Sequence, residues 1–398
     1  MDNFYVISLI KTGLIAFVFL TVLAYLQWVE RKVLAHIQLR PGPYRVGPHG
    51  LLQPLADVIK LLTKEGFIPS NVNTFFYLLA PVLAVTIALI PISVIPFGPE
   101  IEVFGVRTYM QLTDLKVGIL FILALSSMGV YGIALAGWAS NSKYSLLGAL
   151  RSSAQMISYE LPMALAIASP LLVVNTLSLR EMVNMQEGFV LGFLPRWTLL
   201  QGPFPQVFSF IVFMICAFAE TNRVPFDLPE AENELVAGFH TEYSSMSFAA
   251  FFMAEYANMI TVTSVATLLF LGGWHPIFPT EYGSWLIPVL LFVGAGIISI
   301  FHGLNPARPL DRITLPVFGL AFIGLGLAFA LPFLQPYILP LFWFCAKTGF
   351  LLFIFIWIRG TLPRFRYDQL MAFAWKFMFP IALVNLLVTG LAVALTTK

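Results

Sequence analysis

A run of acidic side chains directly after an apolar stretch is the strongest sign of chemistry in this sequence. Residues 204–219 carry no charge, and six carboxylates follow with one arginine, Arg223, in a chain where only 11% of residues are charged. Carboxylates this close together repel one another, so they share protons as a coupled set. The spacing therefore indicates a segment that takes up and releases protons. Its acidic residues are Glu220, Asp227, Glu230, Glu232, Glu234 and Glu242.

Part of this segment also fits the start of a helix. Asp227 is followed three residues later by Glu230, with Pro229 between them, which is the pattern of a capped first turn. In such a helix Glu230 and Glu234 lie one turn apart on the same face. This structural interpretation accounts for Asp227 and Glu230 and leaves the other carboxylates unexplained.

Three more ionisable residues fall inside apolar stretches. Glu160 lies about one turn into one stretch, Glu255 lies deeper in another, and Lys347 lies in a third. Charged groups at membrane depth are costly and normally face a polar interior. With the acidic segment they form a line of titratable groups suited to a proton or ion path. A buried Glu255–Lys347 pair joining two helices, or a Glu160 that reaches the membrane surface, would explain the same residues.

The composition is that of a polytopic membrane protein. Of 398 residues 59% are hydrophobic and 38 are phenylalanine, more than a soluble chain carries. Because a helix needs about 20 apolar residues to cross the hydrocarbon layer, the sequence predicts an all-α fold of about ten transmembrane helices in one membrane domain, residues 1–398. The candidate spans lie near 4–28, 75–96, 115–138, 157–177, 204–219, 246–272, 285–302, 314–334, 338–358 and 375–395.

Lysine and arginine predict the orientation. If the N-terminus is outside, 15 of the 22 lysines and arginines fall in inner loops, so both termini are expected on the outer side. The acidic segment is then an inner loop that breaks the rule. The last inner loop, residues 359–370, is basic and aromatic, which suits a protein partner or anionic lipid. The second and third spans are nearly free of charge and are interpreted as packing helices.

Cysteine and histidine usage excludes several cofactors. Cys216 and Cys345 stand alone in apolar stretches, so the chain offers no ligand set for an iron–sulfur cluster. The five histidines fall in loops or at the ends of spans, and no phosphate-binding or dinucleotide-binding motif is present. We therefore expect this chain to bind no metal, haem, nucleotide or nucleic acid.

The inner segment 29–66 combines arginines with a rigid loop and a short helix. Prolines and glycines recur over 41–48, which predicts a stiff, shaped loop beside Arg40 and Arg45. Residues 51–65 have apolar side chains on one helical face and polar groups on the other. Such a helix is too short to span and fits the membrane interface. A loop that only fixes topology, and a helix that packs on a partner protein, are the alternatives.

Several motifs, taken in order, cover nearly the whole chain. They are Glu30-Arg31-Lys32, Arg40-Pro41-Gly42-Pro43 with Gly47-Pro48, Ala56-Asp57 with Lys60-Leu61, Lys143-Tyr144-Ser145, Tyr159-Glu160, the stretches 220–232 and 234–238, Thr241-Glu242-Tyr243, and Leu362-Pro363-Arg364 with 366–369. Together they resemble the family that contains the H-type membrane subunit of bacterial NADH:quinone oxidoreductase, respiratory complex I, and subunit 1 of mitochondrial NADH dehydrogenase.

The resemblance implies two kinds of site. The segment 29–66 would help form the chamber that admits quinone, the substrate, from the bilayer. The residues assigned to this chamber are Arg31, Arg40, Arg45, Asp57 and Arg223. The inner acidic loop, residues 220–243, would begin a proton path into the membrane arm. The residues assigned to the path are Glu160, Glu220, Asp227, Glu230, Glu232, Glu234, Glu242 and Glu255.

The resemblance also implies partners. The chain would be part of an enzyme without a redox cofactor of its own, coupling quinone reduction to proton translocation in the bacterial inner membrane, in contact with lipid. NADH and iron–sulfur clusters would belong to partner subunits, including a peripheral one that reduces the quinone. Small subunits of the membrane arm would be further neighbours.

One segment departs from the family. The usual member has eight spans, whereas residues 274–341 of this chain hold about two more apolar stretches. An even number of extra spans keeps all later loops on the same side. The sequence therefore predicts an inserted transmembrane hairpin at the edge of the protein.

Other classes of function stay open at this point. A membrane component of an energy-converting hydrogenase would share the fold without the NADH partner, and neighbouring genes would distinguish the two. A secondary transporter would also bury carboxylates at mid-membrane, but such folds commonly contain internal repeats, and none is visible. A purely structural anchor would not need charge inside the membrane.

Overall fold

The fold is helical throughout, apart from two short hairpins in the part that is described. The structure, a computed structural model, describes residues 2–103, 105–190, 192–202, 204–227, 237–304, 306 and 309–396. Nine helices among these residues are long and apolar enough to cross a membrane. The prediction of an all-α polytopic membrane protein is therefore confirmed. The hairpins pair β1 (Glu100–Val103) with β2 (Val106–Tyr109) and β3 (Phe189–Val190) with β4 (Leu194–Pro195).

The helices follow the predicted stretches closely. The long ones are α1 (Asp2–Ile37), α3 (Thr74–Leu89), α4 (Gly118–Ala139), α5 (Lys143–Val174), α9 (Ser245–Phe270), α10 (Leu286–Leu304), α11 (Asp311–Ala330), α12 (Gln335–Thr361) and α14 (Phe379–Thr396). Shorter helices and turns are α2 (Gln53–Thr63), α6 (Leu179–Met185), α13 (Tyr367–Phe373), η1 (Pro48–Gly50), η2 (Ile90–Ser93), η3 (Gly238–His240), η4 (Thr280–Tyr282) and η5 (Ala374–Met378).

The stretch predicted as the fifth span forms a shorter helix. This helix, α7 (Val207–Glu220), has 14 residues and is shorter than each of the nine long helices. It begins just after Pro205 and Gln206, and the side-chain amide of Gln206 donates to the carbonyl of Phe204 at 2.7 Å. Most of its C-terminal half is buried, so α7 is a core helix of the bundle.

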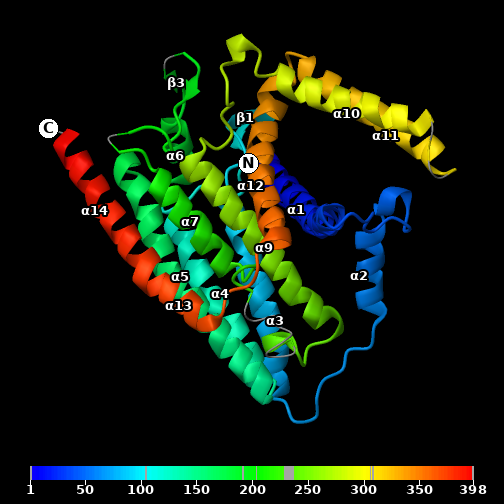
Figure 1. The fold of residues 1–398 in the computed structure, drawn as a ribbon. Coiled ribbons are helices and arrows are strands. Elements are labelled where there is room, and N and C mark those ends of the chain that lie inside the picture. Colours follow the sequence, from blue (N-terminus) through cyan, green and yellow to red (C-terminus); the bar gives the residue numbers. More distant parts are fainter. Residues whose placement is uncertain are drawn as a thin grey trace.

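The long helices form a bundle with a hairpin beside it. α3, α4, α5, α7, α9 and α14 make up the bundle, and α12 and α1 lie against it (Figure 1). The α10–α11 hairpin contacts α12 and projects away from the bundle, with its tip near the loop between α1 and α2. Two paired helices thus lie within the segment 274–341. Their status as an insertion into the family fold stays a prediction.

Helix α2 occupies the centre of the stretch expected to lie in the membrane interface. Its apolar side chains are exposed in this chain, namely Leu55, Val58, Ile59 and Leu62. An amphipathic helix with an uncovered apolar face suits either lipid or a partner surface. Both alternatives raised by the sequence are therefore still open for α2.

The turn before α9 is held tightly against α3 and α5. Tyr77 and Tyr243 stack with ring centroids 4.2 Å apart, and the Tyr77 hydroxyl donates to the carbonyl of Glu242 at 2.7 Å. On the other side, Gly148 of α5 meets the backbone of Gly238 so closely that a Cβ atom would lie 2.7 Å from its Cα. These contacts fix the position of the segment 237–244.

We expect the substitution Gly148→Ala to destabilise the protein. The added methyl group would overlap backbone atoms of Gly238, which cannot rotate away, so a loss of about 1–3 kcal/mol is expected. The thermal midpoint of protein solubilised from its native membrane measures the effect. Gly349→Ala in α12 is the matched control, because nothing lies within 4 Å of its Cβ position. Equal midpoints for the two variants would contradict the close contact.

His240 makes stability depend on pH. Burial lowers the pKa of His240 from 6.5 to about 4. Between pH 6.5 and 4 this histidine is therefore mostly protonated in the unfolded chain and mostly neutral in the folded chain. Stability is thus lost as the pH falls from 6.5 towards 4, by about 2 kcal/mol at pH 5. His240→Gln should therefore show a smaller drop in thermal midpoint between pH 7 and pH 5 than the unchanged protein. The control is a variant of the exposed His302. If this variant and His240→Gln showed the same drop in thermal midpoint, His240 would not be the residue responsible.

Candidate functional site

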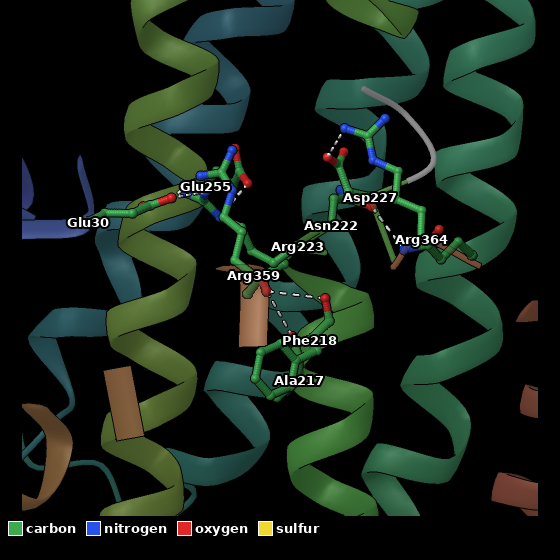
Figure 2. A network of polar contacts seen from close by, with 11 residues as sticks. Glu30, Ala217, Phe218, Asn222, Arg223, Asp227, Glu255, Arg359 and Arg364 are labelled. Carbon is green, nitrogen blue, oxygen red and sulfur yellow. Dashed lines mark hydrogen bonds and ion pairs between the residues drawn. The ribbon is translucent and has the colours of Figure 1, made fainter. Parts of the chain in front are cut away.

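A buried arginine joins three segments in the middle of the molecule. Arg223 follows α7, and its backbone N–H donates to the carbonyl of Phe218 at 3.2 Å. Its guanidinium contacts Glu30 of α1 through Nη1 at 3.2 Å and Glu255 of α9 through Nε at 2.7 Å (Figure 2). The ring of Tyr256 lies 4.4 Å from the guanidinium carbon. The arginine is therefore surrounded by groups that stabilise its positive charge.

A second arginine completes this network. Arg359, near the end of α12, donates to the same carboxylate oxygen of Glu30 (Figure 2). Glu30 is 2% exposed and Arg223 is 4% exposed, so neither is bathed in bulk water. Charges at such depth must be neutralised by partners, and removing one partner leaves an uncompensated charge. We call Glu30, Arg223, Glu255 and Arg359 the central network.

The central network adds two residues to those that the sequence predicted. Arg223, which the resemblance assigns to the quinone chamber, is buried among helices, whereas Arg40 and Arg45, assigned to the same chamber, are exposed. The assignment of Arg223 stays a prediction. Sequence reasoning missed Glu30 and Arg359 as site residues. The available signal was a charge at the end of an apolar helix, which usually faces a polar interior.

The segment after α7 is held by α5 and by the last inner loop. The amide of Gln155 donates to the carbonyls of Ala219 and Phe226, both at 2.8 Å. Asp227 is 2% exposed and pairs with Arg364 at 3.1 Å. Glu230, Glu232 and Glu234 lie outside the described residues, and so does the helix start predicted for Asp227 and Glu230.

Two serines of α4 hold two of the predicted glutamates. Ser126 donates to the carboxylate of Glu220, at the end of α7, and the adjacent Ser127 donates to that of Glu160 on α5. The third span was interpreted as a packing helix, but it also supplies these polar groups. The signal was a pair of hydroxyl residues in an otherwise apolar stretch.

A cavity is lined by both Glu220 and Glu255. It has a volume of about 90 Å³ and lies among α3, α4, α5, α7 and α9. That volume is enough for several water molecules. Most of the lining is apolar, and its polar side chains include Ser126, Glu220, Asn222, His240, Glu255, Asn258 and Thr261. Glu255 of the central network and Glu220 therefore line the same cavity.

Lys347 has a different role from the one expected. Its ammonium donates to the carbonyls of Leu271, Gly273 and His275 at 2.6, 3.0 and 2.7 Å. These carbonyls follow the C-terminus of α9, where a cation stabilises unpaired acceptors. Leu271 is 16 residues beyond Glu255, or about 24 Å along a helix. The Glu255–Lys347 pair is therefore wrong, and Lys347 lies off the line of titratable groups.

The segment 29–66 places its charged residues in two settings. Arg31 pairs with Asp57 of α2 at 2.8 Å, and Gln53 donates to the same carboxylate at 2.9 Å. Arg40 and Arg45 are exposed on the loop before α2 and stand apart from this pair. Glu242 also stands apart from the central network, in the turn before α9. In the described part of the chain no group of three His, Cys, Asp or Glu side chains could hold a metal ion.

Known proteins match this chain over almost its full length. The family described as NADH dehydrogenase matches residues 10–390. A protein of Solibacter usitatus, named as an H-type subunit of NADH-quinone oxidoreductase, is 69% identical over 398 residues, covering 100% of this chain and 99% of that protein. A protein of Koribacter versatilis, named as an H-type subunit of the same enzyme, is 48% identical over 402 residues, covering 98% of both. The chain therefore belongs to the NADH dehydrogenase family of membrane proteins, together with the H-type subunits of NADH-quinone oxidoreductase.

Proposed function

We propose that this chain is a membrane subunit of a proton-translocating NADH:quinone oxidoreductase. In this role it forms part of the quinone-binding chamber and couples quinone reduction to proton transfer through its carboxylates. Relatives whose names contain NADH-quinone oxidoreductase support this complex over a hydrogenase. The observation that carries the coupling is that neighbouring residues of α1 serve both sites: Glu30 belongs to the central network and Arg31 pairs with Asp57.

The chamber wall is formed by the segment 29–66 in this proposal. Exposed Arg40 and Arg45 on a proline-rich and glycine-rich loop attract the polar headgroup, and Arg31 with Asp57 forms the adjacent wall. The apolar face of α2 guides the quinone tail from the bilayer. Electrons come from a peripheral iron–sulfur protein of the complex, because this chain offers no cluster ligands.

Coupling follows from electrostatics. Reduction places negative charge on the headgroup until it takes up protons. A unit charge about 10 Å from a buried charge changes its energy by about 2 kcal/mol at an effective dielectric constant of about 20. That is enough to change the ratio of protonated to ionised carboxylate by more than about ten-fold. A quinone within about 10 Å of Glu30 would therefore shift the protonation of the central network.

Protons then move along the polar groups that line the cavity. Water in the cavity joins Glu255 to Glu220, and the hydroxyls of Ser126 and Ser127 carry the connection towards Glu160. Hydroxyl groups suit this task because each can donate and accept a hydrogen bond. Asp227, Glu242 and the acidic residues Glu230, Glu232 and Glu234 supply protons from the inner side.

The surroundings of the chain are part of the proposal. It lies in the bacterial inner membrane with both termini on the outer side, as the distribution of lysine and arginine predicts. This topology needs an even number of crossings, so α7 crosses together with the nine long helices of the described residues. The peripheral iron–sulfur and quinone-site subunits dock on the inner loops. Small membrane-arm subunits and lipid cover the exposed apolar faces of the helices.

Replacement of Asp227 by asparagine tests the acidic loop. The Arg364 side chain is 40% exposed, so water can solvate its charge when the Asp227 carboxylate is replaced. We therefore expect the variant complex to assemble. We expect Asp227→Asn to lower quinone reductase activity coupled to pumping by about ten-fold or more. Asp368→Asn is the matched control, because Asp368 pairs with Arg366 at a similar 3.2 Å but is 67% exposed. Unchanged rate and proton yield in Asp227→Asn would count against the proposal.

Replacement of Glu220 tests the proton path itself. In the assembled complex Glu220→Gln should reduce the number of protons translocated per quinone reduced, because the path through the cavity loses its acid. Ser126→Ala should cause a smaller reduction, since it removes only the hydroxyl bound to Glu220. The control is Ser158→Ala, whose hydroxyl donates to the carbonyl of Ala154 in its own helix. A full proton yield in Glu220→Gln would exclude this path.

A further inference from the structure

The tip of the α10–α11 hairpin contains a buried acid that none of the steps above uses. Asp311, the first residue of α11, is 3% exposed. The hydroxyl of Tyr44 donates to its Oδ2 at 3.0 Å, and Nε2 of His49 lies 3.5 Å from its Oδ1. Both partners belong to the loop between α1 and α2, more than 260 residues earlier in the chain.

Burial of the Asp311 carboxylate costs free energy, which its neighbours must offset. A carboxylate taken out of water is costly unless nearby groups neutralise it and form hydrogen bonds to it. The loop supplies the Tyr44 hydroxyl as a hydrogen-bond donor and places the His49 imidazole 3.5 Å away, and the N-terminus of α11 adds its positive dipole. Contact between the hairpin and the loop is therefore favourable only when Tyr44 and His49 lie against the Asp311 carboxylate.

The loop needs such an anchor because its backbone is strained. Leu39 and His49 have φ angles of 56° and 50°, in the left-handed region that costs a residue with a side chain about 1–2 kcal/mol. The His49 ring also contacts the Tyr44 ring edge-on at 5.1 Å, and the Lys32 ammonium lies 5.1 Å from the Tyr44 ring. Tyr44 and His49 are thus the residues that join the loop to Asp311 of the hairpin.

The hairpin is a rigid support for this anchor. A side chain at Gly296 would lie 2.6 Å from the carbonyl oxygen of Gly319, so the two helices touch backbone to backbone. At its other end the hairpin is fixed to α12 by Phe292, Phe329 and Phe342, with ring centroids 5.5–6.1 Å apart. Asp311 is therefore held by the body of the protein.

We propose that Asp311 is a positioning residue that acts through Tyr44 and His49 to fix the loop bearing Arg40 and Arg45, and thereby sets the affinity for quinone. The inference rests on the proposed function, in which this loop forms the mouth of the chamber. It gives the hairpin a task in quinone binding rather than in lipid contact alone.

Kinetics of the assembled complex test this role. In Asp311→Ala the KM for quinone should rise roughly ten-fold, the size expected from loss of one hydrogen bond to a charged group, while kcat at saturating quinone stays near its original value. Asp311→Asn should recover much of the affinity, because its amide oxygen still accepts from Tyr44. Asp114→Ala is the control, since it removes an ion-paired carboxylate far along the chain, where Asp114 meets Arg180 at 2.9 Å.

A second variant ensures that the test does not depend on assembly of Asp311→Ala. Tyr44→Phe removes only the hydroxyl and should raise KM in the same way. The KM of the double variant, Asp311→Ala with Tyr44→Phe, should be no higher than that of the more affected single variant. Both changes remove the same Tyr44–Asp311 hydrogen bond, so their effects do not add. Additive effects, or a fall in kcat with an unchanged KM, would overturn the positioning role.

Labelling separates failure of this inference from failure of the proposed function. Val46→Cys in a Cys345→Ser background places a thiol on the loop, and Cys216 is buried. A maleimide should react faster with Val46→Cys when Asp311 is replaced by alanine. An unchanged labelling rate overturns the anchoring. Faster labelling with an unchanged KM supports the anchoring and overturns the assignment of the loop to the chamber.

Discussion

The structure depends on the burial of Arg223 between two glutamates from different helices. Arginine keeps its proton in proteins, so its charge has to be balanced where it lies. Glu30 from α1 and Glu255 from α9 provide that balance, and Arg359 from α12 offsets the second negative charge. The network therefore fixes three long helices against the turn after α7. A change in the charge of any one of these side chains therefore changes the electrostatic energy of the others, so their ionisation states are coupled.

Polar groups elsewhere in the bundle follow the same logic on a smaller scale. Ser126 and Ser127 stabilise carboxylates that apolar neighbours would leave without partners, and Gln155 satisfies two carbonyls where the chain leaves α7. The cavity lies between these groups and the central network. Polar groups are thus concentrated inside the bundle, around a cavity that Glu220 and Glu255 both line, while many apolar side chains are exposed on the outward faces of the helices. That division explains how a membrane protein contains many carboxylates without losing its fold.

The sequence predicts the helices better than it predicts their partners. Length and apolar content locate the nine long helices, and the cost of intramembrane charge identifies Glu160 and Glu255 as members of a polar interior. The uncharged stretch 204–219 already indicated that α7 is short, and the helix has 14 residues. Composition could not pair Arg223 with Glu30 or Arg359 with Glu30, since these residues are 193 and 329 positions apart along the chain. For Lys347 the sequence offered a carboxylate partner, whereas three backbone carbonyls nearer to it satisfy the charge.

The charge balance of the central network also constrains how coupling could work. With both glutamates ionised the network is neutral, because two arginines face two carboxylates. Protonation of Glu255 leaves two arginines facing one carboxylate and gives the network a net positive charge. In a low-dielectric interior that state is favourable only if a negative charge arrives nearby. Under the proposed function, a reduced quinone beside Arg31 would be such a charge, because Arg31 is next to Glu30 in the chain. Proton uptake at the network and electron arrival in the chamber would then stabilise each other, which is the reciprocity that coupling requires.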